Sequence, residues 1–348
     1  MPSTDSSQTL AMDLEICLES LRNRRLEEHF SSVYIPLFAR PNLQACDSDV
    51  FPLMDKAQIF LTSERQVMLI LGDAGSGKST FLRHLERTLW TNYKKGGAIP
   101  LLVNLPAIDQ PELGMVTKQL KMYNFDTDQI QELKEQRQFV LICDGYDENQ
   151  LTINFHRTNK LNQKDELRAK MVVSCRTQFL APDYQNRFVP QSTMPYQPAQ
   201  LGLYQEAIIA PFSKEQIKDY VTCYVALEPR VWVAGDYMQV LTTTPNVMDL
   251  AKDPFLLAIL LGALPSVTEG QLDLTNIPIT RAELYDNLVH VWFDANLRRL
   301  QGGRTSNDDS SRLALAIYDE QDGNSVVQYN RRCDKMSGIH ARQAQWTT

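Results

Sequence analysis

Short apolar runs alternate with polar segments through the central part of the 348-residue chain. Continuous apolar runs of this kind are typical of strands buried on both faces, and the polar segments between them suit helices. The expected strands are residues 67–71, 99–103, 139–143, 171–174 and 206–209. The expected helices include residues 78–93, 116–123 and 128–136. This alternation predicts an α/β fold with a parallel sheet flanked by helices.

Outside this region the apolar spacing is helical. Residues 13–28 carry leucines at roughly helical intervals among charged residues, which predicts an amphipathic helix packed on the rest of the protein. After residue 211 strand-like runs stop, and residues 213–216 (SKEQ) and 280–283 (TRAE) are capping-box patterns that begin helices. The most apolar run, 254–265, is shorter than the roughly 20 residues of a membrane span, and it predicts a buried helix.

A glycine-rich loop follows the first expected strand. Its residues are Gly72, Asp73, Ala74, Gly75, Ser76, Gly77, Lys78, Ser79 and Thr80. Between a strand and a helix, the spacing G-x-x-x-x-G-K-S is that of a phosphate-binding loop, whose backbone N–H groups face phosphate oxygens. Lys78 would reach the β- and γ-phosphates, and Ser79 would offer its hydroxyl to Mg²⁺. A glycine turn without a ligand is the alternative.

A second expected strand ends in an acid. Residues 139–143 are followed by Asp144, and in P-loop proteins an aspartate at this place holds Mg²⁺. The alternative is that Asp144 and Gly145 merely begin a turn. Because a phosphate loop is present in the same chain, we assign Asp144 to the metal together with Ser79.

The residues after Asp144 indicate a family. Gly145, Tyr146, Asp147 and Glu148 follow it, so the next acids come three and four residues later. This D-G-h-D-E arrangement, together with the G-D-A-G-S-G-K-S-T loop, resembles the NACHT family of STAND-class P-loop NTPases. The resemblance implies that Glu148, our first choice, and Asp147 orient or activate the attacking water. A solvated acidic loop is the alternative.

Three further segments resemble this family. Arg176 follows the strand 171–174 like the family's sensor arginine, which would neutralise charge on the γ-phosphate; a structural ion pair is the alternative. The family often has proline next, where Thr177 stands here. Pro254 resembles the proline that packs near the adenine ring, although proline also suits the first turn of any helix. Residues 33–37 (VYIPL) resemble the segment that precedes NACHT domains and lines their base pocket.

Composition narrows the function classes. The net charge of −7 argues against generic nucleic-acid binding, and the basic cluster at residues 22–25 is interpreted as a solvated helix face. The six cysteines are scattered, with no C-x-x-C pair, which suits a reduced cytoplasmic compartment. Cys143 and Cys175 are expected as small apolar core residues, and His84 as a packing residue.

These patterns divide the chain into four expected parts. They are an N-terminal helical arm (1–32), a NACHT-like P-loop core (33–211), a helical lid domain (212–300), and a linker with an irregular or truncated tail (301–348). We expect a short or truncated fungal-type or NLR-like member of the family.

The predicted function is that of a switch. The chain would bind ATP and Mg²⁺, hydrolyse ATP slowly, and couple its ATP or ADP state to conformational change and self-association in signalling. ATP is favoured over GTP because no guanine-reading N-K-x-D motif is visible. One rival is a P-loop kinase that transfers phosphate to a small molecule, and the other is a nonhydrolysing nucleotide-binding scaffold. Neither a nucleic-acid partner nor a membrane span is expected.

Overall fold

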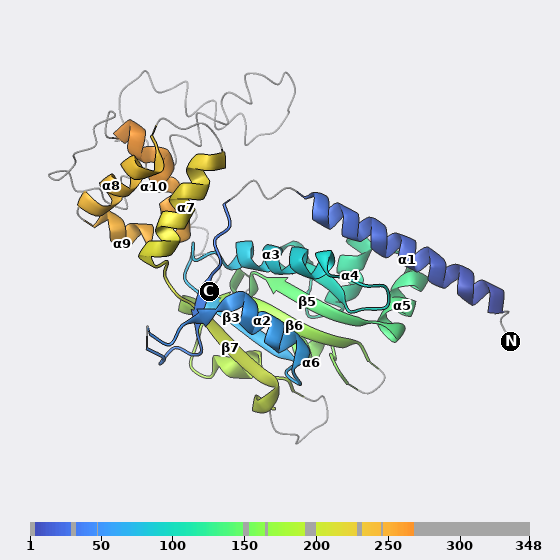
Figure 1. The fold of residues 1–348 in the computed structure, drawn as a ribbon. Coiled ribbons are helices and arrows are strands. Elements are labelled where there is room, and N and C mark those ends of the chain that lie inside the picture. Colours follow the sequence, from blue (N-terminus) through green and yellow to red (C-terminus); the bar gives the residue numbers. More distant parts are fainter. Residues whose placement is uncertain are drawn as a thin grey trace, which may run out of the picture. The chain divides into compact units, whose positions relative to one another are not determined.

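A mixed seven-stranded sheet forms the core of the described part of the chain. The computed structural model describes residues 4–28, 33–46, 48–148, 153–163, 166–191, 200–227, 232–244 and 246–267. Within these residues the sheet has the order β2-β1-β7-β3-β6-β5-β4 (Figure 1). The strands are β1 (Phe38–Arg40), β2 (Phe51–Pro52), β3 (Val67–Gly72), β4 (Ile99–Asn104), β5 (Gln138–Asp144), β6 (Arg168–Arg176) and β7 (Tyr204–Ile209).

The strands from β7 to β4 pair in parallel, so their carboxyl ends lie at one edge of the sheet. β6 is inserted between β3 and β5. In register, Gly72 of β3 is opposite Arg176 of β6, and Cys143 of β5 is opposite Val173. Residues far apart in the sequence therefore meet just beyond these strand ends, where α/β proteins bind their ligands.

All five predicted strands are present, each slightly longer than expected. The sequence patterns missed β1 and β2, which pair antiparallel at the other edge, because strands of three and two residues are too short to show a period. They also missed the helix α2 (Leu53–Thr62), although Leu53, Ala57 and Phe60 are buried at helical spacing.

Helices lie on both faces of the sheet. Besides α2, they are α1 (Thr4–Glu27), α3 (Lys78–Thr91), α4 (Met115–Met122), α5 (Thr127–Gln136) and the short α6 (Phe155–Thr158). Figure 1 shows α1, α3, α4 and α5 on one side, with α2 on the other. Successive residues of β3 point to opposite faces, and all of them are buried, so both faces carry a core.

The N-terminal helix α1 packs on α3, as its leucine spacing predicted. Leu14, Leu18 and Leu21 are buried in the same apolar cluster as strand β3. The interpretation of residues 22–25 as a solvated face was wrong for Arg25, whose guanidinium pairs with the buried Glu86 of α3 at 2.6 Å. Arg22 also donates to the Trp90 carbonyl, at 2.9 Å. A buried charge needs such a partner, and the pattern of residues along one helix does not reveal it.

In the described residues after β7 the structure has the helices α7 (Lys214–Leu227), α8 (Ala234–Thr243), α9 (Val247–Ala251) and α10 (Pro254–Val267). The first capping box is confirmed, because Ser213 Oγ accepts the Gln216 N–H and Gln216 Oε1 accepts the Ser213 N–H. The apolar run 254–265 forms the largely buried α10. No helix in the described part of the chain is both long and apolar enough to cross a membrane. The pattern at 280–283 and the segment 301–348 lie outside the described residues.

Candidate functional site

The glycine-rich loop turns from β3 into α3. Gly75 and Gly77 have φ values of 85° and 91°, in the left-handed region that favours glycine. A Cβ atom on Gly75 would lie 2.6 Å from Asp253 Oδ1 and 3.0 Å from the Phe255 Cβ. Both the backbone conformation and the close approach of the start of α10 therefore require glycine at position 75.

The Lys78 ammonium turns back onto this loop. It donates to the carbonyls of Gly72 and Asp73, at 2.8 and 2.7 Å. Burial lowers its pKa, and the nearby carboxylates of Asp147 and Asp144 act in the opposite direction. With the unpaired N–H groups at the start of α3, the ammonium makes this end of the site attractive to anions.

Asp144 lies at the end of β5 and is held by Ser174 of β6. Ser174 donates its hydroxyl proton to Asp144 Oδ1 at 2.7 Å and accepts the Gly145 N–H at 3.0 Å. Gly145 has a φ of 81°, which lets the chain turn sharply directly after the acid. Sequence reasoning did not select Ser174, although it stands two positions before Arg176 on a predicted strand.

Asp147 and Glu148 both contact Arg176 but differ in exposure. Asp147 Oδ1 accepts the backbone N–H of Arg176 at 2.9 Å, and its Oδ2 lies 3.0 Å from the Nε atom. This second contact is an ion pair without hydrogen-bond alignment. Glu148 Oε1 lies 3.2 Å from Nη2. The Asp147 side chain is 3% exposed and that of Glu148 is 51% exposed, so only Glu148 is readily reached by water.

Tyr146 anchors the short turn that carries these two acids. Its ring packs against Phe155 and Phe188, with centroids 5.4 and 4.6 Å away. Its hydroxyl donates to the Ile153 carbonyl at 2.9 Å. The residue between Gly145 and the acids thus fixes the turn in the core, while the acids contact Arg176.

Thr177 links the end of β6 to the phosphate loop. Its hydroxyl donates to Asp73 Oδ1. This contact depends on threonine at the position where the resembled family often has proline, because proline offers no hydroxyl. The departure from the family pattern therefore adds a polar link between β6 and the loop.

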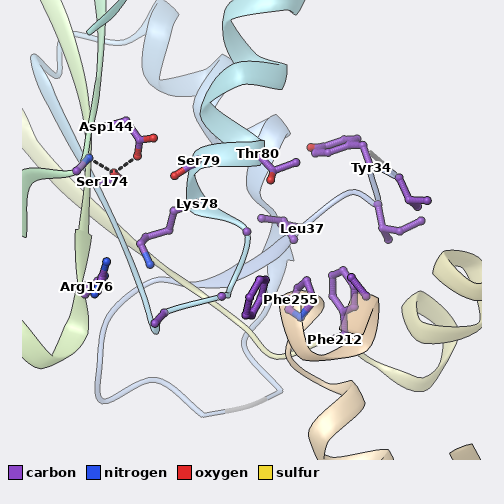
Figure 2. Close-up of a pocket in the computed structure, with 18 of the residues that line it drawn as sticks. Tyr34, Leu37, Lys78, Ser79, Thr80, Asp144, Ser174, Arg176, Phe212 and Phe255 are labelled. Atoms are coloured by element: carbon purple, nitrogen blue, oxygen red, sulfur yellow. Dashed lines mark hydrogen bonds between the residues drawn. The ribbon is translucent and has the colours of Figure 1, made fainter. Parts of the chain in front are cut away.

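These elements surround a cavity of about 410 Å³, within the range of small-molecule sites. Figure 2 shows its two ends: Lys78, Asp144, Ser174 and Arg176 gather at one, and aromatic and aliphatic side chains gather at the other. Those of the second group include Tyr34, Leu37, Phe212 and Phe255. The cavity thus combines a charged end with an apolar end.

Most predicted site residues line this cavity. Those that do are Ala74, Gly75, Gly77, Lys78, Ser79, Thr80, Asp144, Asp147, Glu148, Arg176 and Pro254. Gly72, Asp73 and Ser76 belong to the same loop but do not line it. The lining also includes Phe212, Tyr220 and Ala258, which no motif had marked and which only the packing of the chain brings here.

Four residues of the segment 33–37 line the apolar end of the cavity: Val33, Tyr34, Ile35 and Leu37. That this end receives a base stays a prediction. Tyr34 stacks on His84 of α3, with ring centroids 3.8 Å apart and planes at 16°. His84 is thus a packing residue, as expected. Leu37 approaches the phosphate loop from the same segment, since a Cβ on Gly77 would lie 3.4 Å from its methyl carbon.

The two core cysteines near the site are inert. Cys143 and Cys175 are buried on β5 and β6, and burial raises the pKa of each thiol to about 12. A thiol with such a pKa stays protonated near neutral pH and is a poor nucleophile. The expectation of small apolar core residues is confirmed.

The match to a protein-family model agrees with the phosphate loop. Residues 66–228 match the model of the NACHT domain. No curated protein matches the chain.

Several solved structures are similar, at low identity. The Walker-type ATPase PABY2304 of Pyrococcus abyssi has 13% identity and a TM-score of 0.37, over 76% of this chain and 77% of that one. A chain of the HORMA:CdnC:Trip13 complex of E. coli MS115-1 has 14% identity and a TM-score of 0.32, over 75% and 82%. The FIGL-1 AAA domain in complex with ADP has 13% identity and a TM-score of 0.32, over 77% and 82%.

Proposed function

The chain contains a NACHT domain over residues 66–228, and from this premise we propose that it is a STAND-type switch that binds ATP with Mg²⁺ and hydrolyses ATP slowly. The nucleotide state would govern conformation and self-association in cytoplasmic signalling. The observation that carries the proposal is the single cavity in which the phosphate loop, Asp144, the acid turn and an aromatic wall meet.

The charged end suits the phosphate chain. Lys78 already donates to loop carbonyls, and it can exchange these for the stronger charge-assisted bonds to phosphate oxygens. The loop N–H groups and the start of α3 add the backbone donors of a phosphate site. The apolar end then suits a nucleoside base, which stacks on aromatic side chains such as Tyr34 and Phe255.

The residues at the charged end fit Mg²⁺. Ser79 and Asp144 both line the cavity and offer oxygen atoms, the ligands that this ion prefers. No group of three or more metal-binding side chains occurs in the described part of the chain. That is compatible with Mg²⁺, which takes few protein ligands and completes its coordination with phosphate and water. Once bound, the ion would neutralise charge on the β- and γ-phosphates.

The two acids divide into different roles. Asp147 is buried and uses both oxygens on Arg176, so we assign it to holding the arginine beside the phosphate site. Glu148 is half exposed and has one guanidinium contact, which leaves an oxygen for a water molecule. Glu148 would therefore orient or activate the water, and Arg176 would stabilise charge that develops on the γ-phosphate.

A contact between the loop and α10 supports the switch. The Asp253 carboxylate caps α10 by accepting the N–H groups of Phe255 and Leu256, and it also abuts Gly75 of the loop. Phosphates bound by the loop would thus alter the surface on which this helix rests. A ligand that interacts differently with two packings shifts the balance between them.

The test is nucleotide binding and turnover. Mass analysis would identify any nucleotide that copurifies, and a fluorescent ATP analogue and phosphate release would be followed with and without Mg²⁺. We expect Mg²⁺-dependent binding and slow phosphate release. Failure to bind ATP would contradict the proposal. Binding without release would indicate a scaffold, and transfer of labelled phosphate to a metabolite would indicate a kinase.

A further inference from the structure

Residues at the end of β6 contact the phosphate loop, the acid turn and Asp144. Because β6 lies between β3 and β5, Thr177 reaches Asp73 of the phosphate loop, and Arg176 reaches the acid turn. Ser174 contacts Asp144 across the strand pair, as the dashed line in Figure 2 marks. Of these contacts, the one made by Ser174 is the most enclosed, since this residue is 1% exposed.

The Ser174 hydroxyl both donates and accepts a hydrogen bond in the structure. A serine hydroxyl has one proton to donate. Its oxygen accepts the Gly145 N–H, and its proton goes to Asp144 Oδ1. Both partners come from the end of β5, so the hydroxyl fixes the acid and the turn after it as one unit. Asp144 is then held through one oxygen, and the other remains for a ligand.

Building on the proposed function, we propose that Ser174 is the positioning residue of the metal carboxylate. Ser174 lines the cavity, but its hydroxyl is already engaged by Asp144 and Gly145, so it would act by fixing the orientation of Asp144. A carboxylate free to rotate must be ordered when the ion binds, and partners that order a ligand in advance commonly raise metal affinity 10-fold or more. Its loss should therefore weaken the response to Mg²⁺ while sparing Mg²⁺-free nucleotide binding.

The test is Ser174→Ala with an Mg²⁺ titration of ATP-analogue fluorescence. We expect the Mg²⁺ concentration that gives half of the Mg²⁺-dependent fluorescence change to rise roughly 10-fold. The affinity for the ATP analogue in EDTA and the circular dichroism spectrum should be unchanged. Ser174→Thr, which retains the hydroxyl, should recover much of the Mg²⁺ response. Cys175→Ala, a buried truncation at the next position of β6, should leave it unchanged.

A double-mutant cycle separates this role from a packing role. If Ser174 acts through Asp144, then Ser174→Ala should add little to the loss caused by Asp144→Asn. Independent, additive losses would overturn the inference, as would an unchanged Mg²⁺ titration in Ser174→Ala. These results are distinct from failure of the proposed function, in which the unmodified chain itself would bind no nucleotide, and that outcome would overturn both.

Discussion

The two ends of the cavity are built in different ways. The charged end comes from contiguous motifs at the carboxyl ends of three neighbouring strands, and hydrogen bonds and ion pairs fix its side chains. The apolar end comes from the separate segment 33–37, from Phe212 and Tyr220, and from the start of α10, which meet only by packing. We infer that the charged end provides most of the affinity for the phosphates and the residues for hydrolysis. The apolar end would select the base, and its shape would depend on how the helices pack.

Lys78→Ala should have the largest effect. Loss of the ammonium should weaken both ATP and inorganic tripolyphosphate at least ~100-fold, since a hydrogen bond between charged groups in a shielded site is lost. Fluorescence competition would measure both ligands. The matched control is Lys118→Ala, because Lys118 also caps loop carbonyls, those of Asp109 and Gln110, but does not line the cavity. Retained tripolyphosphate binding in Lys78→Ala would contradict the assignment of the charged end.

Glu148→Gln should come next, with an effect on turnover rather than on binding. We expect ATP hydrolysis to slow at least ~10-fold, because the amide cannot accept a proton from water. Phosphate release in single turnover would measure this. Glu166→Gln is the control, since Glu166 also forms an exposed ion pair, with Lys160.

Asp147→Asn tests whether Asp147 and Glu148 have different roles. Because Asp147 holds Arg176, its neutralisation should release the arginine and lower ATP affinity and turnover together. The same assays as for Glu148→Gln would show it. If Asp147→Asn alone abolished turnover with affinity intact, while Glu148→Gln hydrolysed normally, the roles would be reversed.

Phe255→Ala should have a smaller effect, confined to the apolar end. We expect about a fivefold loss of ATP affinity and no change for tripolyphosphate, because an aromatic contact contributes of order 1 kcal/mol. Ile59→Ala, which shortens another exposed apolar side chain on α2, is the control. Equal losses for both ligands would show that Phe255 acts through the phosphate loop, and the division of the cavity would fail.

Mild acid should have the smallest effect on the difference between ATP and tripolyphosphate binding, because it destabilises the fold as a whole. The His156 Nε2 lies 2.9 Å from Gln66 Oε1, and its buried Nδ1 has no hydrogen-bond partner. Burial lowers the pKa of His156 to about 4, so protonation favours the unfolded chain, where the pKa is about 6.5. The resulting stability is complete above pH 6.5 and is lost as pH falls toward 4, by roughly 3 kcal/mol.

Urea unfolding between pH 7.5 and 4.5 would measure this loss. His156→Gln, which keeps a polar group near Gln66 but does not titrate, should flatten the pH dependence. ATP and tripolyphosphate binding should decline together as the fold fails. A pH dependence of unfolding that is the same in His156→Gln would exclude His156 as its source.

Several elements of the fold and of the site are encoded in local sequence patterns. Five buried strands, the helix after the phosphate loop and the capping box at Ser213 follow from apolar periods and cap chemistry, which act over a few residues. The phosphate loop and the acids after β5 could also be predicted from the sequence. Each lies at a fixed spacing from the end of a strand, and this spacing places it at the charged end of the cavity.

The remaining features depend on strand order and packing, which the three-dimensional fold sets. Insertion of β6 between β3 and β5 places Ser174 against Asp144 and Arg176 against both acids, and no local period encodes which strands are neighbours. The difference in burial between Asp147 and Glu148 was also not visible in the sequence, where both acids belong to the same short motif. The buried Arg25–Glu86 pair and the apolar wall of the cavity were equally invisible, because their partners are distant in the chain and meet only when the core closes.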